Sequence, residues 1–136
     1  MDEKEWLVRH GLRPDGRGLD EVRTLLVEQI QLEPESQGRG NTILMRLCCV
    51  QLFLAALLDD VPLIWSAKTA SWDADCSIDI ELLCAGGLEQ TKAYLSRHST
   101  QEGQAALKRL LHCEGAGYFD EFSPAEQSAS YLASYS

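Results

Sequence analysis

Acidic residues gather in one stretch of the chain, residues 59–81, where six Asp or Glu side chains stand against the single Lys68. Asp75 and Asp79 are one helical turn apart, and like charges at this spacing repel each other by roughly 0.2–0.5 kcal/mol. Local helix stability therefore does not explain the cluster. Three interpretations stay open, namely a solvated face, a docking surface for a basic partner and a divalent-metal site. The spacing of the acids lacks the glycine and the final glutamate of a calcium loop.

Two tryptophans lie in the same stretch and add large apolar surfaces to it. Trp65 and Trp72 are seven positions apart, so they share a face if one helix spans both. Lys68 lies between them, at the spacing of a cation–π partner for either ring. Tryptophans at helical spacing are most often core residues, whereas partly exposed ones anchor protein interfaces. The docking interpretation predicts a partner-binding face of Asp59, Asp60, Trp65, Trp72, Asp73, Asp75, Asp79 and Glu81.

A second acidic and aromatic segment, residues 118–122, lies near the C-terminus, and residues 110–136 contain no Lys or Arg. Its aromatic side chains are expected to cover the edge of the core. Alternatively, the segment belongs to the same acidic and aromatic binding face.

The cysteines and histidines show no spacing that is typical of catalysis or of zinc binding. His112 and Cys113 are adjacent, which directs their side chains about 100° apart on a helix. His98 is placed at a predicted helix C-terminus, where a positively charged imidazole is favoured. The five cysteines are an odd number without C-x-x-C spacing, and we expect all of them to be reduced. The sequence also lacks phosphate-binding loops, dinucleotide fingerprints and nucleophile elbows, and no cofactor is predicted.

The whole chain is acidic, with 136 residues, a net charge of −9 and a pI near 4.7. This charge disfavours nucleic acid and anionic membranes as partners. The length fits one domain, 1–136, and the apolar content of 45% is typical of globular proteins. The first residues do not resemble a signal peptide, and the apolar run 43–58 is too short for a bilayer span. We therefore expect a cytoplasmic location.

Apolar periodicity predicts an all-α domain of about seven short helices, packed as antiparallel hairpins around a buried central helix, 43–58. The expected core face of this helix consists of Leu47, Val50, Leu54 and Leu57. The layout is similar to that of helical repeats, although no residue pattern recurs at a fixed period. The remaining predicted helices cover residues 2–9, 19–33, 62–71, 76–83, 88–97, 99–112 and 124–135.

Capping and breaking residues set the expected boundaries of these helices. Pro34 is expected to end the second helix at Glu33, before a polar loop at 34–40. Asn41 or Thr42 is expected to cap the central helix, and Asp60 the next one, with Pro62 in its first turn. Ser99 with Glu102, and Ser123 with Glu126, have the spacing of capping boxes. The segment 76–83 also alternates like a strand, but it has no partner strand, which favours a helix.

The leading functional hypothesis is a small protein-interaction module that binds a basic partner protein through an acidic face. Its most concrete form is an inhibitor similar to immunity proteins or antitoxins, which share the small size, the acidity and the lack of catalytic motifs. Such acidic inhibitors suit basic nucleases because they can occupy a site meant for phosphates. The alternative is a ligand- or metal-binding helical enzyme domain with an Asp/His site between helices.

Overall fold

The computed structural model describes residues 2–35 and 41–135, and over these ranges the chain forms helices and no strands. The α-helices are α1 Glu3–His10, α2 Gly16–Glu35, α3 Thr42–Ala55, α4 Val61–Lys68, α5 Trp72–Ser77, α6 Leu88–Ser96, α7 Gln101–Gly115 and α8 Pro124–Ser134. Two short 3₁₀-helices, η1 Leu58–Asp60 and η2 Ile80–Leu83, connect them. The predicted all-α fold is confirmed. None of the described helices is long and apolar enough to cross a membrane.

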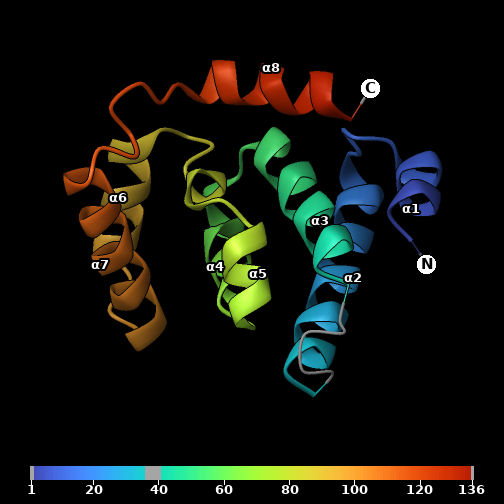
Figure 1. Cartoon of the computed structure of the whole chain (residues 1–136), viewed down its shortest axis with the longest axis horizontal. Helices are drawn as coiled ribbons and strands as arrows, with labels where there is room; N and C mark the ends of the chain where they lie inside the picture. The colour runs from blue at the N-terminus through green and yellow to red at the C-terminus, as the bar shows by residue number, and fades with distance from the viewer. Residues whose placement is uncertain (1, 36–40, 136) are drawn as a thin grey trace.

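Helix α3 lies at the centre of the fold. It packs against α1, α2, α4, α5, α8 and η2, and nearly every residue from Leu44 to Phe53 is buried. Figure 1 shows the successive pairs α2 and α3, α4 and α5, and α6 and α7 side by side, with α8 lying across one end of them. An apolar helix needs neighbours on every side, because burial of its side chains drives the packing. The prediction of a surrounded central helix is confirmed.

The central helix ends earlier than the sequence predicted, at Ala55 instead of residue 58. Ala56 adopts a left-handed conformation with φ 58°, and its N–H donates to the carbonyls of Leu52 and Phe53. The chain therefore turns before Leu57, whose side chain is 49% exposed. Leu54 is half-buried, so only Leu47 and Val50 of the predicted core face are fully buried.

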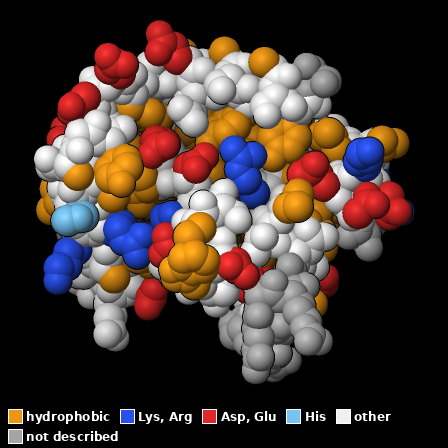
Figure 2. Space-filling view, viewed as in Figure 1, with side chains coloured by type: hydrophobic (Ala, Val, Ile, Leu, Met, Phe, Trp, Pro, Cys, Tyr) orange, Lys and Arg blue, Asp and Glu red, His pale blue; other side chains and the backbone are white. Residues whose placement is uncertain are grey.

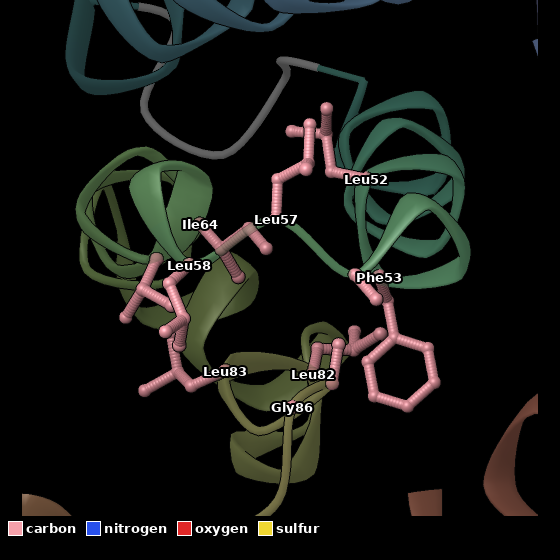
Figure 3. Close-up of a pocket in the computed structure, with 11 residues that line it drawn as sticks. Leu52, Phe53, Leu57, Leu58, Ile64, Leu82, Leu83 and Gly86 are labelled. Carbon is pink, nitrogen blue, oxygen red and sulfur yellow. The ribbon is translucent and has the colours of Figure 1, made fainter. Parts of the chain in front are cut away.

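A small apolar cavity lies beside this turn. Figure 3 shows Phe53 of α3, Ile64 of α4 and leucine side chains from α3, the α3–η1 turn, η1 and η2 arranged around it. Its volume of about 10 Å³ holds at most one water, and the side chains that line it are apolar. The cavity is therefore a packing gap and not a ligand site.

Other helix boundaries also differ from the predicted ones. Helix α2 extends through Pro34, which lies in its last turn, so the helix does not end at Glu33 as predicted. Within the predicted polar loop, residues 36–40 lie outside the described residues. The helix predicted for 62–71 ends at Lys68. The segment 76–83 contains the end of α5 and all of η2, with Ile78 extended between them, so it is helical in type but interrupted.

The caps follow the sequence closely, with two exceptions. Asn41 caps α3 through the N–H of Leu44, and Ser123 caps α8 through the N–H of Glu126. Helix α7 is capped by Thr100 and not by Ser99, since the Thr100 hydroxyl accepts from the N–H of Gly103. The other exception is Asp60, whose side chain makes no capping bond.

Candidate functional site

Asp60 is a buried structural residue. Its side chain precedes α4, as predicted, but the carboxylate accepts from Arg23 on α2, with Nε–Oδ1 and Nη2–Oδ2 distances of 2.8 and 3.0 Å. Asp60 is only 5% exposed. A buried carboxylate requires a cation, which explains why Arg23 holds it in place of a helix N-terminus. Asp60 is therefore removed from the candidate partner-binding residues.

Asp75 is also held by cations of the protein itself. Arg109 on α7 donates two hydrogen bonds of 3.1 Å to its carboxylate, and the Lys68 Nζ lies 3.0 Å from Asp75 Oδ1. Desolvation alone would raise the pKa of Asp75, but the hydrogen bonds from Arg109 and Lys68 outweigh it and lower the pKa. The Lys68 ammonium also donates to the backbone carbonyls of Asp75 and Ile78. It joins α4 to α5 and does not lie over a tryptophan ring, contrary to the predicted cation–π pair.

Asp79 faces a different group of side chains. Its carboxylate lies 3.5 Å from Arg46 on α3 and 3.4 Å from the hydroxyl of Tyr131 on α8. The extended Ile78 separates Asp79 from α5, so Asp75 and Asp79 do not share a helix face as the sequence predicted. Each of these acids instead has its own cation, which removes the repulsion expected from their spacing.

The two tryptophans have opposite environments, because the chain turns between α4 and α5. Trp65 is 5% exposed, donates its indole N–H to Glu102 over 3.2 Å and lies under the guanidinium of Arg109. Trp72 begins α5 and is 79% exposed. Trp65 is therefore a core residue, and Trp72 alone stays available to a partner.

The acids that remain exposed do not form one surface. Asp59 precedes α4, whereas Trp72 and Asp73 follow it, and the eight residues of α4 put about 12 Å between its two ends. Asp59 accepts a long hydrogen bond of 3.4 Å from the Tyr94 hydroxyl, and Asp73 is exposed in the first turn of α5. Glu81 lies elsewhere, on η2.

Glu81 lines an open cleft together with the segment between α7 and α8. The cleft has a volume of about 500 Å³ and is bordered by Glu81, Gly117, Tyr118, Asp120, Glu121, Phe122 and Gln127. Figure 2 shows acidic side chains around hydrophobic ones on the part of this face that carries the α7–α8 connection. Among the described residues that line the cleft there are three carboxylates and no cation. We call this site the acidic cleft.

The walls of the acidic cleft are set by local turns. Gly117 has φ 91°, which favours glycine, and a Cβ there would lie 3.1 Å from Asp120 Oδ2. Phe119 is buried and packs edge-on against Phe122, with ring centroids 5.4 Å apart, which anchors the connection on the core. Tyr118 is left 64% exposed at the border.

Glu81 is half-buried in this wall, and its environment disfavours the charged form. Desolvation is the largest cause and the negative charge of Asp79 the second, and both raise the pKa of Glu81 above its usual value. A cation that enters the cleft would oppose both effects, because an opposite charge nearby favours the carboxylate.

The sequence predicted only some residues of the acidic cleft as partner-binding residues. Glu81 belonged to the predicted partner-binding set, and segment 118–122 was an alternative part of the same face. The absence of Lys and Arg after residue 109 was the available signal. Nothing local indicated that η2 and the α7–α8 connection meet, because their contact depends on how α3, α7 and α8 pack.

The geometry gives the predicted Asp/His site no support. Within the described part of the chain, no group of three His, Cys, Asp or Glu side chains is placed to hold a metal ion. His10 lies 3.3 Å from Glu21, and the Nδ1 atom of His98 lies 2.7 Å from the carbonyl of Tyr94.

No protein-family model, curated protein or solved structure shows significant similarity to this chain.

Proposed function

We propose that this protein is an interaction module that binds a basic partner protein at the acidic cleft. The observation that carries the proposal is the placement of Glu81, Asp120 and Glu121 around one open cleft of about 500 Å³, with no cation among its described lining residues. Elsewhere the acids Asp60, Asp75 and Asp79 are matched by arginines of the protein itself. The cleft therefore gathers three carboxylates without a cation of their own at a place that a partner can reach.

The charge and the aromatic content of the cleft both favour Lys and Arg side chains. The net charge of −9 attracts a basic protein over a distance, and the local carboxylates then fix its orientation. Tyr118 offers an exposed ring, on which a guanidinium or ammonium group gains roughly 0.5–1 kcal/mol at an exposed site. An anionic partner would meet repulsion from all three carboxylates.

The finer form of the proposal is an inhibitor similar to immunity proteins or antitoxins. In that form the partner is a basic nuclease, and the acidic cleft occupies the surface that would otherwise bind phosphates. The small acidic chain and the absence of a metal-binding group in its described residues are compatible with such a role.

The proposal can be tested with an oligolysine peptide and its fully acetylated counterpart as probes. Titration of the ¹⁵N-labelled protein should shift the amide resonances of Glu81 and residues 117–122. The acetylated peptide should shift none of them, because it has lost its positive charges. High salt should weaken the binding of oligolysine, since it screens the attraction.

Two double variants separate binding at the cleft from a general effect of charge. Asp120→Asn with Glu121→Gln should weaken binding about three- to tenfold, since exposed ion pairs contribute about 0.2–1 kcal/mol each. Asp59→Asn with Asp73→Asn removes the same charge from exposed positions outside the cleft and should leave the affinity nearly unchanged. Equal weakening by both variants, or peptide-induced shifts centred on Trp72, would reject the acidic cleft as the binding site.

A further inference from the structure

A second pocket lies between α4, the end of α6 and the start of α7, and it shares no residue with the acidic cleft. Its lining includes Pro62, Trp65, Leu95, His98, Glu102 and Ala106. The volume is about 50 Å³, and since a single water needs roughly 10–15 Å³, the pocket admits a group of several heavy atoms. We call it the Trp65 pocket.

The interior of the Trp65 pocket is apolar. Trp65, Leu95 and Ala106 are all buried and present carbon atoms to it. The tight turn between α6 and α7 forms one wall, and it requires a glycine at position 103. A Cβ on Gly103 would lie 2.8 Å from the carbonyl oxygen of His98. An aliphatic group fits these walls, because apolar cavities of this kind favour apolar ligands over water.

The polar groups of the pocket accept hydrogen bonds. Glu102 is exposed, which places it at the rim, and one of its oxygens accepts from the Trp65 indole. Among the described residues no cation lies within ion-pair distance of its carboxylate. The Nδ1 atom of His98 faces the carbonyl of Tyr94, which can only accept, so Nδ1 carries the hydrogen and Nε2 is left as an acceptor in the neutral ring.

The same pocket does not suit an anion. The Glu102 carboxylate at its rim repels an anion, and in the first turn of α7 the Thr100 hydroxyl already accepts from the N–H of Gly103. Arg109, whose guanidinium lies over the Trp65 ring, donates its hydrogen bonds to Asp75. A ligand for this pocket should therefore combine an aliphatic body with a positively charged hydrogen-bond donor.

We propose that the Trp65 pocket binds a small primary alkylammonium ion. The alkyl chain lies between Trp65, Leu95 and Ala106, and the ammonium group donates to the Glu102 carboxylate and to Nε2 of His98. This orientation places the charge at the rim and the alkyl chain inside. A lysine side chain of a partner protein would have to enter with its ammonium group first, which would place the charge inside and not at the rim. The pocket therefore favours a free amine over a lysine side chain.

Three related probes test the inference, namely isopentylamine, isopentanol and isopentanoate. Isopentylamine should bind with a dissociation constant on the order of 1 mM, as expected for so small a ligand. It should raise the thermal midpoint and shift the amide resonances of residues 95–106. Isopentanol should bind about fivefold more weakly, because it lacks the charge, and isopentanoate should not bind. Equal binding of the amine and the alcohol, or no binding of the amine, would overturn the inference.

Variants locate the site and separate it from the acidic cleft. Glu102→Gln keeps an acceptor for the Trp65 indole but removes the charge, and should weaken isopentylamine about fivefold. Glu28→Gln, an exposed position on α2, is the matched control and should have no effect. Ala106→Val narrows the pocket and should abolish binding of the amine without altering the response of the cleft to oligolysine. The assignment of the pocket would fail if oligolysine competed with isopentylamine. It would also fail if Glu28→Gln weakened the binding of isopentylamine as much as Glu102→Gln does.

Discussion

Single side chains in the segment 59–81 have roles that their charge alone does not reveal. Lys68 is 5% exposed, and its ammonium is satisfied by Asp75 and by two backbone carbonyls. A buried lysine without a counter-ion is costly, so Asp75 matters more to folding than an exposed acid of the same helix. The neighbouring Asp73, which is exposed, provides the natural comparison.

We predict that Asp75→Asn lowers the free energy of unfolding by about 2–4 kcal/mol at pH 7, because it leaves Lys68 and Arg109 without their carboxylate. Asp73→Asn should change it by less than about 0.5 kcal/mol. Urea unfolding monitored by circular dichroism measures both values. Similar stabilities of the two variants would contradict the structural role of Asp75.

The same ion pair predicts how stability depends on pH. Because the pKa of Asp75 is lowered in the folded protein, its stabilising effect is complete above the unfolded pKa of about 3.9 and is lost as the pH falls through the folded pKa. The difference between the wild type and Asp75→Asn should therefore shrink below about pH 4.

At the scale of elements, α3 stabilises the fold because its neighbours bury nearly all of its side chains. Its C-terminal boundary determines which leucines take part. Leu47 lies within the helix and is fully buried, whereas Leu57 follows the left-handed Ala56 and is about half exposed. The two residues have the same side chain, so they report the effect of burial alone.

Leu47→Ala should reduce the free energy of unfolding by about 2–5 kcal/mol, since it removes buried methyl groups and leaves a cavity. Leu57→Ala should cost less than about 1 kcal/mol, because about half of its side chain is hydrated already. Chemical denaturation of the two variants gives both values. A central helix that ended at residue 58, as the sequence suggested, would make the two costs similar.

At the scale of the whole molecule, the ion pairs connect elements that are far apart in the sequence. Arg23 on α2, Arg46 on α3 and Arg109 on α7 each meet an acid from segment 59–81. Loss of the tertiary fold therefore breaks all three together, and the buried side chains should become accessible in one step.

The cysteines provide a measurement of that step. All five are free thiols, and Cys76 alone is exposed, while burial raises the pKa of Cys48 and of Cys84 to about 12. In the native protein a thiolate-specific reagent should modify one cysteine quickly, and the other four only as the protein unfolds. Mass spectrometry after timed labelling counts the modified thiols. Rapid labelling of more than one thiol under native conditions would show that the core opens locally.

The sequence by itself determined the type and the approximate order of the elements. Apolar periodicity and caps such as Asn41 and Ser123 act over one or two helical turns, so they are visible in short stretches of sequence. The same local signals predicted a buried central helix. They failed at the C-terminal ends of α3 and α4, which the sequence placed three residues too late.

Only the tertiary structure decided which acids are free to bind a partner. A cluster of six acids around Lys68 looks like one surface in the sequence, yet three of its members pair with arginines from other helices. Glu81 instead lines the acidic cleft together with Asp120 and Glu121. The physical reason is that ionic pairing and burial depend on distances between residues far apart along the chain, which the packing of the helices sets and local sequence patterns do not contain.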